Sequence, residues 1–403
     1  MRFDPSRRLF LRGASLAAAG VGFAPSRLLV RAAEAATNGR VLVKVFLRGA
    51  ADGLNLCVPH GEAEYYALRR EIALPRPGQS GGVVDLDGHF GLHPELAPLA
   101  PFFQDGRLAV VHAVGNPLVT RSHFDAQDFQ ESGTPAVKST ATGWLDRAIA
   151  QVPGSEVTQA VTFASQSVRS FLGPEPVLVA QTLSSFDLRA RTWRAEAERL
   201  LRQMYEADRS DVGATGRETF EAITTLQSVP AAAPANGAVY PTAAVGTALR
   251  QAAQLVKAGI GTRCIYVNVT GGFDTHSNQL ANNTADYRPL GQALAAFATD
   301  LGGRLDDVAL MVTTEFGRTA AVNGAAGTDH GTGYCMLVLG GRVRGGRVLG
   351  RWPGLASSQL FEGRDLAATT DWRDVFQELA RTQLDIPASL FPGYTPGPGV
   401  GLS

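Results

Sequence analysis

The sequence predicts a layered α/β domain built on a central, mostly parallel sheet. VLVKVFL (Val41 to Leu47) is a short β-branched apolar run, which is typical of a strand buried on both faces. The segment from CIYVNVT to VALMVTTEF indicates a strand, a helix and a second strand. The helix between them carries one apolar stripe, formed by Leu290, Leu294, Phe297 and Leu301. Two strands joined by such a helix normally run parallel in one sheet, which favours the layered α/β class.

The first half of the chain continues the alternation of strands and helices. PELAPLAPFFQDG predicts a helix opened by Pro94 and closed by Gly106, and RLAVVHAVG predicts the next strand. TRSHFDAQDFQESG predicts another helix, because Ser122 stands three residues before Asp125 as in a capping box. The order is therefore strand, helix, strand, helix.

The middle of the chain is less regular. VTQAVTFA and EPVLVA predict strands, residues 189–207 and 217–226 predict helices, and residues 229–241 form a linker rich in proline and alanine. We interpret residues 165–245 as a cap or insertion within one domain that spans residues 36–403.

The N-terminus indicates export. SRRLFLRG places an arginine pair before the weakly apolar stretch GASLAAAGVGFAP, and this resembles a twin-arginine signal peptide over residues 1–35. The alternatives are an amphipathic helix or a membrane anchor, but the apolar stretch is shorter than the ~20 residues of a spanning helix. We expect the twin-arginine translocase as a partner, a periplasmic or secreted location, and no stable membrane span in the mature chain.

Charge and cysteine usage exclude several classes of protein. The chain has 37 basic and 37 acidic residues; removing residues 1–35 takes away six arginines and two acids, which leaves 31 and 35 and a net charge of −4. Such a balance does not attract nucleic acid. Two of the three cysteines, Cys264 and Cys335, lie in apolar runs, so we expect buried thiols and no disulfide scaffold.

Polar clusters follow the predicted strands. In an open α/β sheet, binding residues gather beyond the carboxyl ends of the strands, so these clusters are expected at one edge. A mixture of carboxylates and neutral imidazoles suits zinc, manganese or iron, whereas oxygen-rich subsets suit magnesium or calcium. The clusters are Asp52, Arg121 to His123, Asp274 with His276, Glu315 with Arg318, and Asp329 with His330.

Each cluster also has a purely structural interpretation. Asp274 with His276 fits an Asx-type turn, Asp52 fits a tight turn, and the loop GTDHGTG fits a plain glycine turn. Glu315 would then pair with Arg318 at the end of its strand.

Ser122 has two interpretations. As an N-cap it needs no catalytic role. A nucleophilic oxygen at a helix N-terminus would meet a phosphate or sulfate that backbone N–H groups already stabilise, so the same serine can serve both purposes.

The order of these clusters resembles the metal and nucleophile order of the alkaline phosphatase and sulfatase superfamily. More closely, the chain resembles an exported bacterial family of unknown function that is distantly related to that superfamily. The stretches that carry the resemblance are FLRGAADGLNLCVP, FGLHPELAPL, TRSHFDAQDFQESG, GGFDTHSNQ, TTEFGRTAAVNGAAGTDHGTG and LGGRVRGG. The resemblance implies a three-layer alkaline phosphatase-like fold with helices on both faces of the sheet.

The resemblance also implies one or two divalent metal ions, with zinc or manganese favoured over magnesium or calcium. One ion would be bound by Asp274, His276 and His330, and the second by Asp52, Ser122 and Glu315. The complete set of implied metal ligands is Asp52, Asp274, His276, Glu315, Asp329 and His330.

The implied catalytic residues are Ser122 as the nucleophile, Arg318 as the group that holds an anionic substrate, and His123. His123 is included because Glu315 is followed by Phe316, where the superfamily usually has a second histidine ligand. Two further departures stand out: no arginine completes a sulfatase signature after Cys57, and the spacing from Asp274 to the next histidine is shorter than in alkaline phosphatases.

The sequence thus favours an exported metal-dependent hydrolase of small phosphate or sulfate esters. The alternatives are a non-catalytic exported protein for binding or envelope assembly, and a phosphoryl transferase or mutase on the same scaffold. The hydrolase interpretation requires five side chains to converge on one point: Asp52, Asp274, His276, Glu315 and His330.

Overall fold

The computed structural model describes residues 39–154, 156–188 and 193–403. The export signal predicted for residues 1–35, and the start of the helix predicted from residue 189, lie outside the described residues. The fold can therefore be compared with the sequence over the remaining chain.

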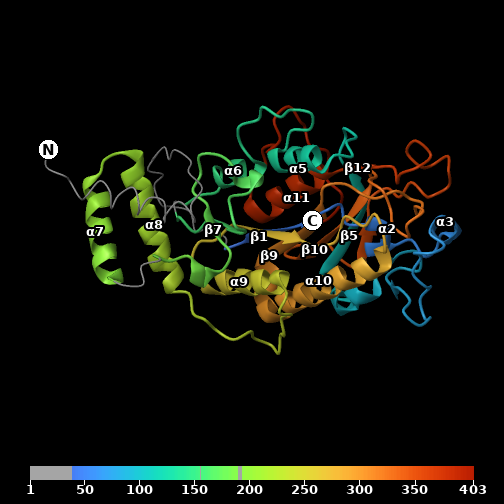
Figure 1. Cartoon of the computed structure of the whole chain (residues 1–403), viewed down its shortest axis with the longest axis horizontal. Helices are drawn as coiled ribbons and strands as arrows, with labels where there is room; N and C mark the ends of the chain where they lie inside the picture. Colours follow the sequence, from blue (N-terminus) through green and yellow to red (C-terminus); the bar gives the residue numbers. More distant parts are fainter. Residues whose placement is uncertain (1–38, 155, 189–192) are drawn as a thin grey trace.

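A mostly parallel sheet forms the centre of the molecule, as the sequence predicts (Figure 1). The strand order is β11-β5-β10-β9-β1-β8-β6-β7, with β12 paired to β5. Strand β10 runs antiparallel to its neighbours β5 and β9, whereas β1 lies parallel to both β8 and β9. The strands are β1 (Val41–Arg48), β5 (Leu108–Gly115), β6 (Ala160–Phe163), β7 (Leu178–Ala180), β8 (Cys264–Thr270), β9 (Val308–Thr314), β10 (Tyr334–Gly340), β11 (Arg347–Leu349) and β12 (Thr370–Asp371).

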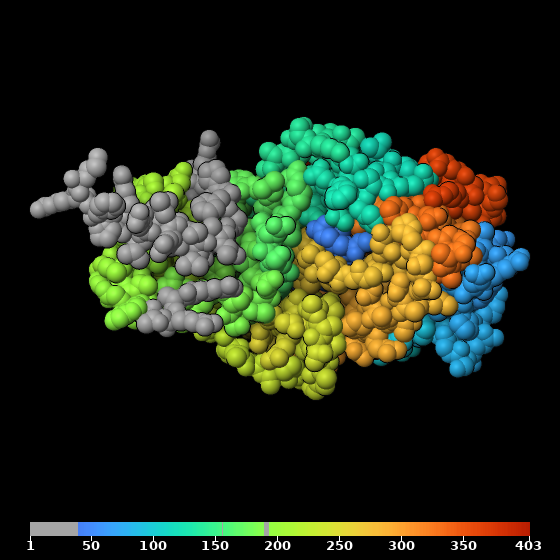
Figure 2. All heavy atoms as spheres, in the orientation of Figure 1, coloured from blue at the N-terminus to red at the C-terminus, as the bar shows by residue number. Residues whose placement is uncertain are grey.

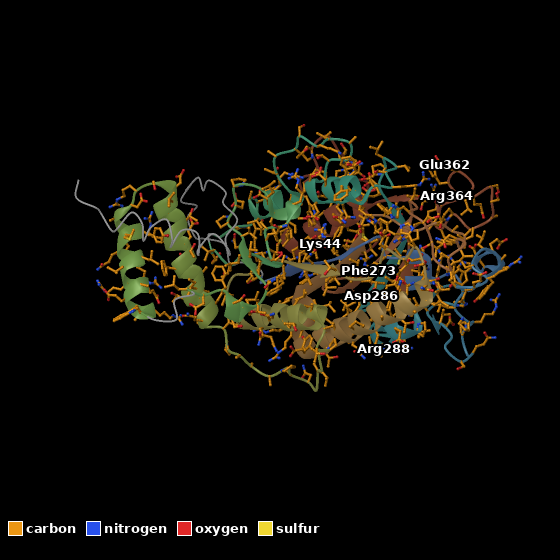
Figure 3. All side chains as sticks on the ribbon, viewed as in Figure 1. Lys44, Phe273, Asp286, Arg288, Glu362 and Arg364 are labelled. Carbon is orange, nitrogen blue, oxygen red and sulfur yellow. The ribbon has the colours of Figure 1, made fainter. Side chains whose placement is uncertain are left out.

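Helices cover both faces of this sheet, and β1 shows why. Its side chains alternate, so Val43 and Val45 enter one hydrophobic core while Leu42 and Phe46 enter the other. Lys44, labelled in Figure 3, lies between the last two and is fully buried. The helices on the first side are α9 (Ala244–Ala258) and α10 (Gln279–Leu301); those on the second are α5 (His123–Ser132), α6 (Trp144–Ile149) and α11 (Trp372–Leu384).

The remaining elements lie around the ends of the sheet. A small sheet has the order β2-β4-β3, and helices α7 and α8 lie together at one end of the molecule, beyond β7 (Figure 1). None of the described helices has the length and apolar character needed to cross a membrane. The bounds are β2 (Cys57–Val58), β3 (Val84–Asp85), β4 (Gly91–Leu92), α2 (Gly53–Leu56), α3 (Ala63–Leu68), α4 (Ala100–Gln104), α7 (Arg194–Ala207), α8 (Asp211–Gln227), η1 (Pro94–Leu99), η2 (Arg169–Phe171), η3 (Leu183–Ser185) and η4 (Gly302–Asp307).

The segment predicted as a cap, residues 165–245, divides between two environments. Its strand β7 pairs with β6 in the main sheet, while α7 and α8 pack on each other. The sequence predicts a helix that begins at residue 217, but α8 begins six residues earlier, because Ser210 caps it. The division of the chain into one domain with a cap stays a prediction.

Strand direction brings the predicted clusters to one edge. Strands β1, β5, β8 and β9 run in the same direction, so their carboxyl ends meet there. Because β10 is antiparallel, the loop that precedes it lies at the same edge. In Figure 2, teal atoms near α5 and gold atoms near α10 flank blue atoms from the beginning of the described chain.

Candidate metal centre

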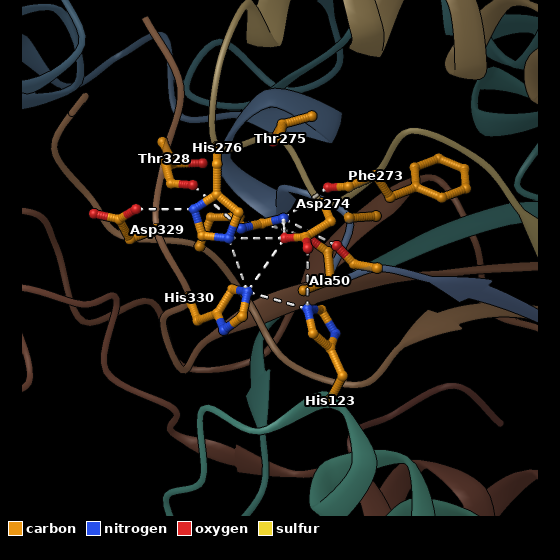
Figure 4. Close-up of polar contacts among 12 residues, drawn as sticks. Ala50, His123, Phe273, Asp274, Thr275, His276, Thr328, Asp329 and His330 are labelled. Atoms are coloured by element: carbon orange, nitrogen blue, oxygen red, sulfur yellow. Dashed lines mark hydrogen bonds and ion pairs between the residues drawn. The ribbon is translucent and has the colours of Figure 1, made fainter. Parts of the chain in front are cut away.

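Three imidazoles and one carboxylate meet at this edge (Figure 4). His123 is the first residue of α5, Asp274 and His276 lie in the loop after β8, and His330 lies in the loop before β10. One ligand atom from each of His123, Asp274 and His330 lies within 4.8 Å of the other two. Four side chains from three distant segments therefore share one point, as the sequence predicts for three of them.

The Nε2 atoms of the three histidines face one another. His330 Nε2 lies 3.0 Å from His123 Nε2 and 3.0 Å from His276 Nε2. Asp274 Oδ1 lies 3.2 Å from His330 Nε2 and 3.1 Å from His276 Nε2. This arrangement leaves the four groups with their lone pairs directed at a common centre.

The Nδ1 atom of each ring has its own acceptor outside this centre. His123 Nδ1 lies 2.7 Å from Glu315 Oε1, and His276 Nδ1 lies 2.9 Å from Asp329 Oδ1. His330 Nδ1 lies 2.8 Å from the carbonyl oxygen of Arg121, which only accepts hydrogen bonds. Each Nδ1 therefore donates its proton outward, and in the neutral ring Nε2 is a bare acceptor.

Bare acceptors at this separation fit a shared cation. Ligand nitrogens bound 2.0–2.1 Å from zinc lie roughly 3.0–3.4 Å apart, which matches the Nε2 separations of 3.0 Å. Carboxylate or carbonyl partners on the far nitrogen are the usual support for metal-bound histidine. Three carboxylates, Asp274, Glu315 and Asp329, lie around the histidines; Arg318 pairs with Asp274, while Arg48 and Arg364 act on Glu315 and Asp329 over longer distances.

Glu315 supports His123 from behind. Its Oε1 accepts hydrogen bonds from His123 Nδ1, from Gln127 Nε2 at 2.8 Å and from the Gly49 N–H at 2.9 Å, and its Oε2 accepts one from Thr314 at 2.8 Å. Burial would raise the pKa of Glu315, but these hydrogen bonds lower it to about 2. The structure thus places Glu315 behind a ligand and not in the ligand position that the sequence predicts.

The surroundings of His123 and His330 shift the pKa values of the two rings in opposite directions. The hydrogen bond to Glu315 raises the pKa of His123, whereas burial lowers the pKa of His330. The lowered pKa of His330 favours the neutral ring, which is the form that binds a metal. Asp329, another predicted ligand, accepts a hydrogen bond from His276 Nδ1. Like Glu315, it therefore lies behind a histidine and not at the centre.

The structure directs Asp52 to different partners. Its buried carboxylate contacts the guanidinium of Arg69 and the amide of Gln279, and it caps α2 by accepting from Leu54 N–H at 3.1 Å. A guanidinium thus neutralises the charge that a second metal ion would have neutralised. The sequence-based assignment of Asp52 as a metal ligand is corrected on this ground.

Arg318 is not free to hold a substrate. Its side chain is buried, and it donates to the carbonyl oxygens of Ala50 at 2.9 Å, Thr328 at 3.2 Å and Phe273 at 3.0 Å, and to Asp274 Oδ1. These contacts fix the carboxylate of Asp274 toward the histidines. The structure therefore corrects the predicted role of Arg318 from anion binding to positioning.

Ser122 has the capping position that the sequence predicts. Its Oγ accepts a hydrogen bond from Asp125 N–H at 3.4 Å, and the helix ends at Gly133 in a left-handed conformation. The serine precedes His123 directly in the sequence. Its role as nucleophile stays a prediction.

Sequence reasoning missed Gln127, which joins the site through Glu315. A signal was present, since Gln127 follows His123 by four residues and so lies on the same face of α5. The Arg121 carbonyl oxygen was also missed, and no side-chain pattern could have identified a backbone acceptor.

A family model described as "Protein of unknown function (DUF1501)" matches residues 40–384. No curated protein matches the chain. Similar solved structures include the C-terminal periplasmic domain of EptC from Escherichia coli in complex with zinc, at 11% identity and a TM-score of 0.33 over 75% of this chain and 73% of that one. They also include the lipoteichoic acid synthase LtaP from Listeria monocytogenes, at 10% identity and a TM-score of 0.34 over 76% and 66%. A protein in the alkaline phosphatase superfamily from Vibrio parahaemolyticus shows 11% identity and a TM-score of 0.34 over 84% and 70%. We draw no functional conclusion from likeness at this level.

Proposed function

The chain belongs to DUF1501, a family of proteins of unknown function, and we propose that it is an exported, metal-dependent hydrolase of phosphate or sulfate esters. One observation carries the proposal. Three imidazole Nε2 atoms and the Asp274 carboxylate are directed at one point, and each imidazole Nδ1 is committed to an outside acceptor.

The five side chains that the hydrolase interpretation requires do not all converge, because Asp52 pairs with Arg69 and Glu315 lies behind His123. We therefore propose a narrower site, in which one divalent ion is held by His123, Asp274, His276 and His330. The majority of imidazole ligands favours zinc, with manganese as the next choice and magnesium or calcium less suited. Such an ion would act as a Lewis acid and neutralise charge on the ester oxygens. Without a cation the carboxylate of Asp274 would face an anionic ester and repel it, so we expect the residues present to need a metal before they bind that substrate.

Ser122 is the proposed nucleophile. Its Oγ would bond to phosphorus or sulfur while the bond to the ester oxygen breaks; the serine proton passes to solvent, and the departing alcohol takes one from solvent. Water then hydrolyses the serine ester and releases the inorganic anion. The N-terminus of α5, a helix of 10 residues, favours the negative charge that this step brings to Ser122.

A substitution that keeps the helix cap provides the test. Ser122→Asn retains an N-cap oxygen but removes the hydroxyl, whereas Ser122→Ala removes both. We expect both variants to bind zinc and to lose turnover of an aryl phosphate or sulfate on the order of 10³-fold, with only Ser122→Ala less stable.

Two results would count against the proposal. Mature protein that binds less than about 0.1 equivalent of zinc or manganese after soaking has no metal centre of the kind that histidine ligands build. Full turnover by Ser122→Asn would remove the serine as nucleophile. If an added alcohol captured the phosphoryl group faster than water, the protein would be a transferase.

Export is the second part of the proposal, and it rests on the arginine pair Arg7 and Arg8. Replacing both with lysine should retain the full-length chain in the cytoplasm, because the twin-arginine pathway reads that pair. Cell fractionation with an immunoblot measures this. Unchanged appearance of the shortened chain outside the cytoplasm would contradict the proposed route.

A further inference from the structure

One face of α5 carries three polar side chains in a row. His123, Gln127 and Glu131 follow one another at intervals of four residues, so they lie on the same side of the helix. His123 is a proposed ligand at the partly exposed end of this row, whereas Glu131 is buried at the other end. The row therefore leads from the candidate metal centre into the interior of the molecule.

Arg48, the last residue of β1, contacts two members of this row. Its Nη1 donates a hydrogen bond to Gln127 Oε1 at 2.6 Å, and its Nη2 donates one to Glu131 Oε1 at 2.5 Å. Its Nε donates to Asn268 Oδ1 of β8 at 2.7 Å. Because all three nitrogens are bonded, the guanidinium is held in one position and one orientation.

The contact with Arg48 fixes the orientation of the Gln127 amide. A guanidinium only donates hydrogen bonds, and a carboxylate only accepts them. The amide oxygen must therefore face Arg48, and the amide N–H group is left to face Glu315, where Nε2 lies 2.8 Å from Oε1. With the amide turned around, both contacts would be lost, because the oxygen would face a carboxylate and the N–H group a guanidinium.

Glu315 connects Gln127 to a proposed ligand. Its Oε1 accepts a hydrogen bond from Gln127 and another from His123 Nδ1 at 2.7 Å, so the position of this carboxylate depends on both. Arg48 is thus joined to the imidazole of His123 by an unbroken chain of hydrogen bonds through Gln127 and Glu315.

The ion pair between Arg48 and Glu131 also has a simpler explanation, which is that it fastens α5 to the sheet. Glu131 is buried and accepts further hydrogen bonds from the Ser170 N–H at 2.9 Å and from Tyr266 at 3.3 Å. This explanation accounts for Nη2 of the guanidinium. It does not require Nη1 to contact Gln127.

We propose that Arg48 is a positioning residue of the metal centre, which acts on His123 through Gln127 and Glu315. By holding the Gln127 amide, it keeps the Glu315 carboxylate directed at His123 Nδ1, and Nε2 is then the atom available to the ion. This inference rests on the proposed function, because it requires the ion that we place at His123.

Replacing Arg48 with lysine tests the proposal. Lysine keeps a positive charge beside Glu131 but lacks the fork that reaches Gln127 at the same time. We expect the affinity for zinc to fall about 3-fold to 10-fold, which is less than the loss of a group that touches the ligand would cause. Competition with a chromogenic chelator measures the affinity, and the absorption spectrum of the cobalt(II)-loaded protein should change as well.

A double variant shows whether Arg48 acts through Gln127. Gln127→Met removes the amide but leaves the ion pair of Arg48 with Glu131, and it should lower zinc affinity by a similar factor. If Arg48 acts by holding Gln127, the double variant should bind zinc no more weakly than Gln127→Met alone.

Arg169→Lys is the matched control. Arg169 pairs with Asp128 of α5 at 2.8 Å, and its side chain is 20% exposed, compared with 23% for Arg48. Within the described part of the chain it fastens the same helix without a contact to Gln127 or Glu315, so zinc affinity and the cobalt spectrum should stay unchanged.

Unchanged zinc affinity in Arg48→Lys, or losses that add in the double variant, would overturn the role of Arg48, while zinc binding by the unchanged protein upholds the metal centre. An equal loss in Arg169→Lys would make the fastening of α5 the cause and overturn the proposal as well. If Arg48→Lys does not fold, Gln127→Met decides, because retained zinc affinity overturns the proposed route and a loss supports it. A protein that binds no zinc at all overturns both the metal centre and this inference.

Discussion

Carboxylates behind two of the histidines orient the rings of the candidate metal centre. Glu315 fixes the tautomer of His123 and Asp329 fixes that of His276. Gly49 makes the first of these contacts possible, because its N–H donates to Glu315 at a φ of 119°. A Cβ at this position would lie 2.9 Å from the backbone nitrogen of Asp274, so only glycine fits.

Glu315→Gln tests this support. The change keeps the shape of the side chain but removes the charge that holds the Nδ1 proton of His123, so Nε2 becomes a weaker ligand. We expect the affinity for zinc to fall roughly 10-fold to 100-fold, measured by competition with a chromogenic chelator.

Glu95→Gln is the control for that measurement. Glu95 pairs with Arg288 on the surface, so its loss should leave zinc affinity unchanged. If the Glu315→Gln variant bound zinc as tightly as the unchanged protein, binding of zinc by His123 would not depend on the Glu315 carboxylate.

Strand β1 buries an ionisable side chain, Lys44, which lowers the stability of the folded protein. Lys44 is fully buried, and its Nζ lies 5.1–5.5 Å from the centres of four aromatic rings. Its one hydrogen bond in the described structure is to Ser170 at 3.4 Å. Burial lowers the pKa of Lys44 from 10.5 to about 7, so the amine in the folded protein releases its proton near neutral pH.

Lys44→Met should therefore stabilise the fold in a manner that depends on pH. The unfolded lysine binds a proton up to pH 10.5, whereas the folded one releases it near pH 7, so the penalty is complete below pH 7 and disappears above pH 10.5. The free energy of unfolding should rise by up to about 4 kcal/mol at pH 7, and by much less at pH 10. Urea unfolding at pH 7, 8.5 and 10 measures the difference.

Lys138→Met serves as its comparison, since Lys138 is exposed and paired with Asp125. It should give no gain at any of the three pH values. A gain from Lys44→Met that is the same at pH 7 and pH 10 would mean that packing, and not the buried charge, causes it.

At the scale of the whole molecule, the proposed metal ion would connect segments that are far apart in the sequence. The site joins α5 to the loops that follow β8 and precede β10, and its most distant members, His123 and His330, are 207 residues apart along the chain. A cation bound only in the folded state stabilises that state by about 2.7 kcal/mol at 100 times its Kd.

We expect zinc to raise Tm by roughly 3–6 °C and a chelator to reverse the rise, as differential scanning calorimetry would measure. His330→Ala should abolish the shift, because His330 contacts both other histidines and Asp274. His89→Ala, a change at a half-exposed histidine paired with Glu62, should retain it. A shift of the same size in His330→Ala would place the zinc elsewhere.

Much of the fold could be read from the pattern of residues. The apolar runs at Val41 and Cys264 form the predicted strands, and Ser122 caps its helix, because burial on both faces and local hydrogen bonding are encoded within a few neighbouring residues. The rule that ligands gather at the carboxyl ends of strands likewise placed Asp274 and His330 together.

Only the tertiary structure decided what each polar side chain does at that edge. Asp52 and Asp274 both follow strands, yet one meets Arg69 and the other meets three histidines. Arg69 comes from the segment after α3, and nothing in the spacing around Asp52 reveals it. The physical reason is that local patterns specify where the backbone goes, whereas the role of a charged group depends on which distant partner satisfies it when water is excluded.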